Sequence, residues 1–253
     1  WYETYGTTKP FILYHRAIDN VTNYEEYLPT KQKIYYDPLL NETAPTIEKG
    51  YLQPSIKSPI ISDLDYITSH TPIWLHAADN QSDLVKIEVS IVGAPSPGDW
   101  YEVWSGAPVA EYNATFNVTE FEANMGITLT KGAIVQIYYH ATDNAGLVSD
   151  LGKQKIVIDD TPPESNVSEL EANYTYGESF IIDVDANDNI EEVNVSSVTL
   201  YYRYSTDNST WNDWVEYGTR TDNFTWEFDA PAGPGYYEFC SVATDGLGNA
   251  GDT

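Results

Sequence analysis

The stretch Tyr138 to Asn144, YYHATDN, decides the fold, because close variants of it stand at two other places in the chain. Tyr14 to Asn20 read YHRAIDN, and Cys240 to Gly246 read CSVATDG. Each copy ends an alternating, aromatic-rich run with an Ala-x-Asp step, and a polar turn follows. In the first two copies the next strand opens with KQKI, at Lys31 to Ile34 and Lys153 to Ile156. Such internal repetition predicts tandem copies of one structural unit.

Strand signals dominate the whole chain, and helical periodicity is nearly absent. Short alternating runs rich in Val, Ile, Tyr, Thr and Trp are separated by Gly, Pro, Asn and Asp. The expected strands of the two fuller copies include Pro72–Ala77, Leu84–Val92, Tyr112–Val118, Ile134–Ala141, Lys153–Asp159, Phe180–Val184, Val195–Tyr204, Thr225–Phe228 and Tyr236–Ala243. About seven short strands per copy predict an all-β fold of tandem β-sandwiches.

The repeats divide the chain into three parts. Residues 1–45 hold the last strands of a preceding sandwich, residues 46–160 form one sandwich, and residues 161–253 form another that lacks its last strand within this window. The linker Ile158 to Ser165, IDDTPPES, carries two prolines that favour an extended, semi-rigid joint. A missing last strand leaves an open sheet edge, which invites pairing with another chain. Two interpretations stay open: a segment cut from a longer ectodomain, or self-association with neighbouring copies of the same protein.

Side chains at alternate positions of a strand lie on the same face, and this alternation predicts which residues of the recurring strand face the core. Tyr237, Phe239, Ser241 and Ala243 share one face, and their equivalents in the middle copy are Val135, Ile137, Tyr139 and Ala141. Cys240 is the only cysteine of the chain and is expected on the outward face, as is His140, which we expect to be exposed.

The last copy resembles the Ig-like or fibronectin-III-like domains of prokaryotic extracellular proteins. The resemblance is carried by Ile190 to Arg203, by Trp214 and by Gly235 to Asn249, and it covers residues 46–253, with a weaker echo in 1–45. The middle copy departs from it through an insertion around Thr119 to Thr130 and lacks the Gly-Asn ending. Such domains occur in archaeal and bacterial surface glycoproteins and as accessory domains of secreted proteases, so the resemblance implies fold and location but no single activity.

Composition narrows the partners and the compartment. The net charge of −27 disfavours nucleic acid and anionic membrane surfaces, and no apolar run is long enough to insert into a bilayer. Of 17 asparagines, 10 begin an N-x-S/T sequon, where chance predicts about 3. Sequons of this density indicate N-linked glycans on an extracellular, cell-surface protein; unmodified polar loops are the alternative. The sequons begin at Asn20, Asn41, Asn80, Asn113, Asn117, Asn166, Asn173, Asn194, Asn208 and Asn223.

The acidic stretch Asp183 to Glu192, DVDANDNIEE, is the best metal candidate. Oxygen ligands at alternate positions suit calcium, and the stretch begins like an EF-hand loop before the pattern fails at its sixth and twelfth positions. The string DANDN also resembles the calcium-binding linker of cadherins, which lies between domains. The predicted calcium ligands are Asp183, Asp185, Asn187, Asp188 and Asn189. A loop whose acidic side chains cap turns is the alternative, and Asp159 with Asp160 at the linker forms a second candidate.

No catalytic motif is visible in the sequence, and we expect a protein that is not an enzyme. Four tryptophans are expected on corresponding strands of the two copies, and they suggest either a sugar-binding platform or shared packing: Trp100, Trp104, Trp211 and Trp214. The expected function is a structural segment of an extracellular surface glycoprotein: an S-layer, a surface filament or a spacer stalk. The alternatives are an accessory region of a secreted hydrolase and an adhesin that binds a glycan or a protein.

Overall fold

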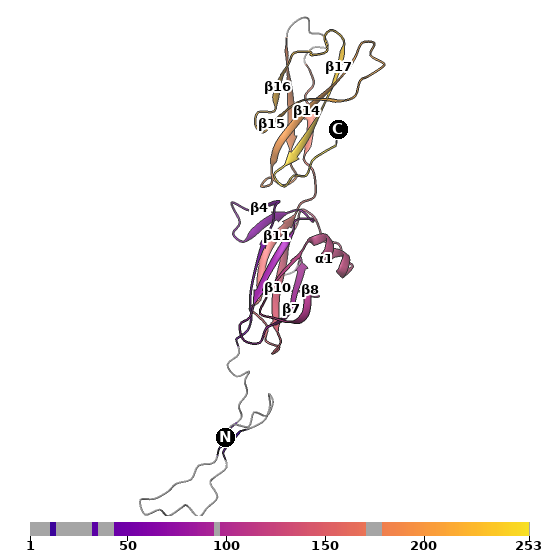
Figure 1. The fold of residues 1–253 in the computed structure, drawn as a ribbon. Helices are drawn as coiled ribbons and strands as arrows, with labels where there is room; N and C mark the ends of the chain where they lie inside the picture. The colour runs from indigo at the N-terminus through magenta and orange to yellow at the C-terminus, as the bar shows by residue number, and fades with distance from the viewer. Residues whose placement is uncertain (1–10, 14–31, 35–42, 94–96, 171–178, 253) are drawn as a thin grey trace, which may run out of the picture.

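The computed structural model describes residues 11–13, 32–34, 43–93, 97–170 and 179–252. Within them the chain is built of β-strands and one short helix, and it forms two β-sandwiches that follow one another end to end (Figure 1). The all-β prediction is therefore confirmed. We call the two units the middle sandwich, from Thr46 to Ile158, and the last sandwich, from Glu164 to Asp245.

The middle sandwich packs a three-stranded sheet against a six-stranded sheet. The strand orders are β3-β6-β9 and β4-β5-β11-β10-β7-β8. The strands are β3 Thr46–Tyr51, β4 Ser55–Lys57, β5 Leu64–Ile67, β6 Ile73–Ala78, β7 Leu84–Val92, β8 Tyr101–Val109, β9 Glu111–Phe116, β10 Ile134–Asp143 and β11 Gly152–Ile158. Neighbours in these sheets run antiparallel except β11 and β5, which run parallel with Lys155 opposite Leu64.

The last sandwich has two three-stranded sheets, with the orders β12-β13-β16 and β15-β14-β17. The strands are β12 Glu164–Val167, β13 Phe180–Asn187, β14 Val195–Ser205, β15 Val215–Arg220, β16 Thr225–Phe228 and β17 Tyr236–Asp245. The recurring strand is β10 in one sandwich and β17 in the other, and each pairs with the long strand that precedes it, β7 or β14. Within the described residues β17 has no second strand partner, whereas β10 also pairs with β11.

Within the described residues, the first copy contains one short pair of antiparallel strands. Strand β1, Phe11–Leu13, pairs with β2, Gln32–Ile34, and Phe11 lies opposite Ile34. This pairing agrees with the predicted hairpin, whose remaining residues lie outside the described part of the chain.

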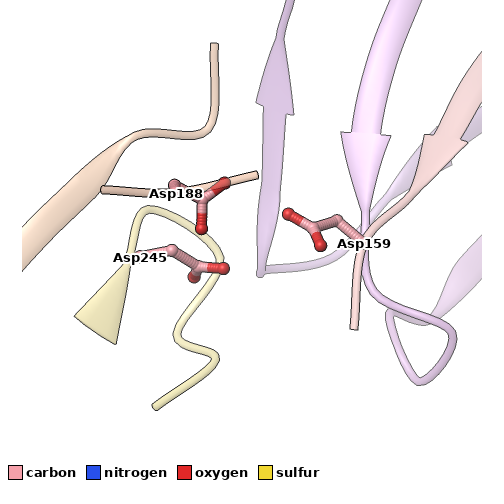
Figure 2. A group of neighbouring side chains, drawn as sticks. All are labelled: Asp159, Asp188 and Asp245. Atoms are coloured by element: carbon pink, nitrogen blue, oxygen red, sulfur yellow. The ribbon is translucent and has the colours of Figure 1, made fainter. Parts of the chain in front are cut away.

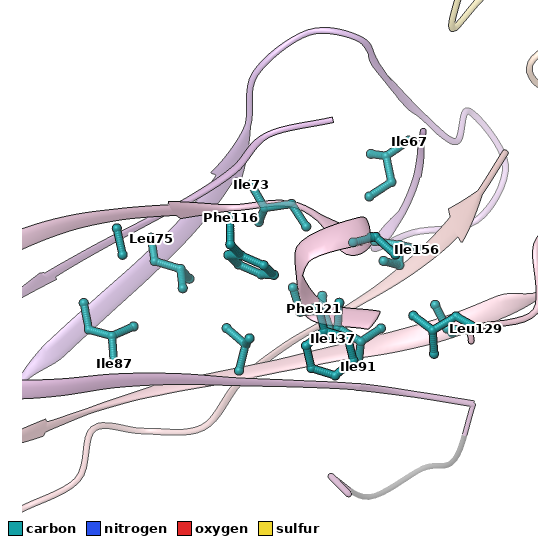
Figure 3. Close-up of a cluster of buried hydrophobic side chains, with 14 of the residues drawn as sticks. Ile67, Ile73, Leu75, Ile87, Ile91, Phe116, Phe121, Leu129, Ile137 and Ile156 are labelled. Carbon is teal, nitrogen blue, oxygen red and sulfur yellow. The ribbon is translucent and has the colours of Figure 1, made fainter. Parts of the chain in front are cut away.

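The core of each sandwich follows the predicted parity. In β10 the side chains of Ile137 and Ala141 are fully buried, and in β17 Ala243 is buried while Phe239 packs against the same cluster. Figure 3 shows the middle core, where aliphatic side chains from both sheets meet around Phe116 and Phe121. Alternation at period two places every second side chain of a strand inside, which explains the match.

The insertion after β9 forms a helix that the sequence analysis did not predict. Helix α1, Val118–Met125, begins at a capping box in which the Asn117 side chain accepts from the Glu120 N–H. The helix ends at Gly126, whose φ of 64° is the left-handed conformation that favours glycine. Val118 and Phe121 are buried, so the helix packs onto the core of the middle sandwich, and Figure 3 shows Phe121 among the core side chains.

Two further features differ from the expectations. Strands β4 and β5 extend the large sheet beyond β11, although no strand was predicted there. His140 is not exposed: its Nε2 lies 2.9 Å from Glu88 Oε2, and its ring lies 4.1 Å from the Trp100 ring. The second layer of aromatic and charged side chains over β10 covers the face that alternation marks as outward.

Candidate metal centre

The two sandwiches share a small apolar cluster at their joint. Leu64, Tyr66 and Val157 of the middle sandwich pack with Ile190, Val193 and Leu247 of the last sandwich, and all six are buried. Burial of apolar side chains from both units stabilises one arrangement of the joint over a free linker. The joint is therefore a packed interface as well as a proline-containing linker.

A hydrogen bond and a close approach at one glycine bring the two units together at this interface. Asn249 Nδ2 donates to the carbonyl oxygen of Asp159 at 3.1 Å, which joins the last sandwich to the end of β11. Gly246 lies so close to its neighbours that an added Cβ would stand 2.6 Å from the Val193 oxygen and 2.8 Å from Ile56 Cδ1. Only glycine fits there without a shift of backbone atoms.

Three carboxylates meet at the same joint. One comes from the middle sandwich and two come from the last sandwich, and Figure 2 shows their side chains turned toward a common space. One oxygen of each lies within 4.8 Å of the others. We call Asp159, Asp188 and Asp245 the joint carboxylates.

The chain holds each of the first two joint carboxylates through one oxygen. Asp159 follows β11 directly; its N–H donates to the Ile67 carbonyl at 2.8 Å, and its Oδ1 accepts from the Thr161 N–H at 3.1 Å. Asp188 follows β13, and its Oδ1 accepts from the Ile190 N–H at 2.7 Å. In both residues the turn fixes Oδ1 and directs Oδ2 elsewhere.

Asp245 is fixed more completely. It is the last residue of β17, and its Oδ1 accepts from the backbone N–H groups of Leu247 at 2.8 Å and Asn249 at 2.9 Å. Its Oδ2 accepts from Asn249 Nδ2 at 2.8 Å. The Ala-x-Asp step of the repeated phrase thus closes the loop that carries it, and it also presents a carboxylate to the joint.

Two oxygens of the joint carboxylates have no hydrogen-bond partner among the described residues. Asp159 is 1% exposed, and both its Oδ2 and the Oδ2 of Asp188 are buried. A buried carboxylate oxygen without a donor or a cation is unfavourable by several kcal/mol on the order-of-magnitude scale for buried charges. These two oxygens can therefore accept a proton, a water molecule or a cation from outside the chain.

The surroundings of the joint also make the ionised form of these carboxylates unfavourable. Burial, opposed by the Thr161 N–H and reinforced by the neighbouring carboxylates, raises the pKa of Asp159 to about 6. Burial also raises the pKa of Asp188, with a further contribution from Asp245. None of the ion pairs among the described residues involves a joint carboxylate. The ammonium group of Lys131 instead lies 3.6 Å from Asp160 Oδ2. Asp160 also accepts a hydrogen bond from the Ser69 N–H through its Oδ1.

Only some of the metal ligands predicted from the sequence lie among the joint carboxylates. Of the acidic stretch, Asp188 joins the centre, whereas Asp183 and Asp185 are exposed on β13, and Asp183 accepts from the Thr225 hydroxyl at 2.7 Å. Asn187 and Asn189 are exposed and lie outside the group of three carboxylates. Of the second candidate, Asp159 joins and Asp160 does not. Asp245 was not among the predicted ligands, although it stands at the end of a phrase that occurs three times in the sequence.

Of the four tryptophans only Trp104 lies within a strand, β8, whereas the other three lie in the loops that precede β8 and β15. All four make packing contacts. Trp104 stacks on Tyr112 with ring centroids 4.1 Å apart, and the Arg203 guanidinium lies over the rings of Trp211 and Trp214. These contacts favour the shared-packing interpretation.

Most sequons stand at accessible positions. Asn80, Asn113, Asn166, Asn194, Asn208 and Asn223 are exposed, and Asn117 is half-buried as the cap of α1. Asn20, Asn41 and Asn173 lie outside the described residues. No helix among the described residues is long and apolar enough to cross a membrane.

Comparison with known proteins finds no family model and no curated protein that matches. Among solved structures, fibronectin(III)-like modules of CbhA from Clostridium thermocellum are similar, with 15% identity over 81% of this chain and 90% of that chain and a TM-score of 0.37. An α-L-rhamnosidase from Streptomyces avermitilis, complexed with L-rhamnose, matches at 11% identity over 81% of this chain and 24% of that chain, with a TM-score of 0.28. Both likenesses are too distant to indicate an activity.

Proposed function

We propose that this chain is a spacer segment of an extracellular surface glycoprotein, in which a divalent cation, best matched by calcium, fixes the joint between consecutive β-sandwiches. The observation that carries the proposal is the pair of buried oxygens of Asp159 and Asp188, which have no partner among the described residues and which meet Asp245 where the two sandwiches join. The role is mechanical: the segment holds its ends at a set spacing when the cation is bound.

The ligand chemistry favours calcium over other metals. The joint carboxylates offer only oxygen, without the histidine or cysteine that zinc prefers. Two oxygens bound to one calcium ion at about 2.4 Å can stand at most about 4.8 Å apart, and the three ligand oxygens lie within that limit. Magnesium demands a smaller and more regular shell, which three carboxylates from separate loops match less well.

The position of the centre explains why a cation would stiffen the molecule. Asp159 belongs to one sandwich, and Asp188 and Asp245 belong to the other. Without a cation, three like charges face one another beside the apolar cluster and oppose its packing. With a cation, the same oxygens attract one centre and reinforce the packing. The free energy of binding therefore stabilises the closed joint.

The remaining parts of the proposal concern location. Calcium sites of extracellular modules bind at about 10⁻⁴ to 10⁻³ M, which suits a centre with three carboxylates in a calcium-rich medium. The accessible sequons and the acidic charge support a hydrated, glycosylated surface. Mass spectrometry of the protein from its own cells tests this part, because sequon peptides without any attached glycan would contradict it.

Isothermal titration of the full chain with calcium tests the central part. We expect saturable binding in the range above and weaker binding of magnesium. Asp188→Asn should abolish binding at the joint, while the matched control Asp183→Asn, which removes the same charge from the exposed face of β13, should bind as the original chain does. Equal loss in both variants would indicate diffuse attraction to an acidic protein and would overturn the joint site.

A further inference from the structure

The outer face of the six-stranded sheet carries two exposed lysines. Lys153 and Lys155 lie two positions apart on β11, so their side chains share one face, and they lie opposite Tyr138 and Gln136 of β10. Neither lysine belongs to an ion pair within the described part of the chain. Lysines often protect the edge strand of a sheet, but β11 lies between β10 and β5, so this reason does not apply here.

The sequence repeats this pair of lysines. The first KQKI supplies Lys31 and Lys33, so 4 of the 12 positively charged residues stand in two copies of one four-residue phrase. In a chain with a net charge of −27, general solubility does not require the few cations to be placed so regularly. Such placement points to contact with an anionic partner.

Exposed aliphatic side chains accompany the two lysines. Leu151, two positions before Lys153, is 48% exposed, and Ile134, at the start of β10, is 51% exposed. Ile134 lies opposite Val157, two positions beyond Lys155, so it stands on the same outer face. None of the ten sequons begins within a strand of this sheet. We call Lys153, Lys155, Leu151 and Ile134 the lysine face.

The last sandwich has a face of the opposite charge. Asp183 and Asp185 are exposed and alternate along β13 with core residues. Ile181, two positions before Asp183, is 51% exposed, and Glu227 of β16 lies opposite it on the same face. None of these three carboxylates takes part in an ion pair among the residues that the structure describes. We call Ile181, Asp183, Asp185 and Glu227 the acidic face.

The two faces match in charge, in spacing and in the kind of surface. Residues two positions apart on a strand are separated by about 6.5 Å, so the two lysines have the same spacing as Asp183 and Asp185. Each face also exposes aliphatic side chains, which can pack together once the charges meet.

We propose that the lysine face docks on the acidic face of a second copy of this chain. Because the contact joins two different faces, each copy keeps one face for a further neighbour, and the association can continue in a row. Other orientations bring acidic surfaces together and are disfavoured. At about 0.15 M salt the screening length of about 8 Å weakens the general repulsion between acidic chains more than it weakens ion pairs in contact. This inference goes beyond the proposed function and does not depend on a cation at the joint.

Sedimentation velocity of the full chain over a range of concentrations, in calcium and in chelator, tests the proposal. Exposed ion pairs are individually weak, so we expect reversible association that grows with concentration. Two double variants, Lys153→Gln with Lys155→Gln and Asp183→Asn with Asp185→Asn, should each stay monomeric alone. An equal mixture of the two should form discrete dimers, because one lysine face and one acidic face remain. The control Lys57→Gln, which removes another exposed lysine without an ion pair among the described residues, should associate as the original chain does.

Asn166 lies opposite Asp185 and begins a sequon, so the chain is measured both as the native protein and after production in a host that adds no glycans. Monomers at every concentration, or association unchanged in both double variants, would overturn the proposal. So would association of the chain without glycans alone, because the glycoprotein would then lack the contact. Association in calcium that disappears in chelator would indicate cations bridging carboxylates and would also contradict it. Loss of the joint site would leave the expected results unchanged.

Discussion

Replacing Asp159 with asparagine should have opposite effects in chelator and in calcium. Asparagine keeps the shape of the side chain and an Oδ1 that accepts from the Thr161 N–H. It removes the negative charge that burial and the other joint carboxylates make unfavourable. In chelator near neutral pH the variant should therefore be more stable than the original chain, whereas in calcium it should lose the stabilisation that the cation provides.

The magnitude follows from the pKa of Asp159, which is raised from 3.8 to about 6. At about 1.36 kcal/mol per pKa unit the ionised side chain destabilises the folded joint by at most about 3 kcal/mol, and solvent screening reduces this to about 1–2 kcal/mol. A change of about 1 kcal/mol moves the melting temperature of a domain of 60–100 residues by about 4–8 °C. At a calcium concentration about ten times Kd, the original chain should gain about 1.4 kcal/mol, and the variant should gain none.

The assay is thermal unfolding followed by intrinsic fluorescence, in chelator and in calcium, with Asp183→Asn as the control of equal charge change. The control should respond to calcium as the original chain does, because Asp183 lies on the exposed face of β13. If Asp159→Asn melts lower than the original chain in chelator and still responds to calcium, Asp159 is a structural residue and the reasoning fails.

Two other predictions follow from the same structure. In chelator, the folded state binds a proton at Asp159 more tightly than the unfolded state does, so the free energy of unfolding should fall as pH rises from about 4 through about 6. Calcium should reverse this trend above about pH 6. A melting temperature in chelator that does not change across this pH range would argue against the raised pKa. Phe121→Ala should lower the free energy of unfolding of the middle sandwich by about 3–4 kcal/mol, because the ring is 1% exposed and anchors α1 in the core. Unfolding in denaturant measures this free energy. A decrease of less than about 1 kcal/mol would mean that the helix is not part of the cooperative core.

The strands could be predicted because alternation at period two is local. Ile137, Ala141 and Ala243 lie inside, as their parity required. Helix α1 was missed because eight residues are too few to show helical periodicity, and its signal, the Asn117–Glu120 capping box, was interpreted only as a sequon. The prediction that His140 is exposed was wrong because alternation tells on which face of the sheet a side chain lies, but not whether other side chains cover that face, as Trp100 does here.

The metal centre could be predicted only in pieces. Asp188 and Asp159 were each named, but in separate candidates, since nothing local in the sequence says that the ends of β11 and β13 meet. Asp185, which alternation of acidic residues favoured, lies on the exposed side of its strand. Asp245 was visible as the conserved step of an internal repeat, yet its role depends on the packing of two domains across Leu247 and Val193. Long-range packing of this kind is what a single sequence does not display.

The distance between the two sandwiches tests the central claim most directly. Spin labels at Glu111→Cys and Thr221→Cys, both exposed positions, in a Cys240→Ser background allow pulsed dipolar spectroscopy of the full chain. The account predicts one narrow distance distribution in calcium and a broader one in chelator, with Asp188→Asn broad in both. Identical distributions with and without calcium would show that no cation fixes the joint.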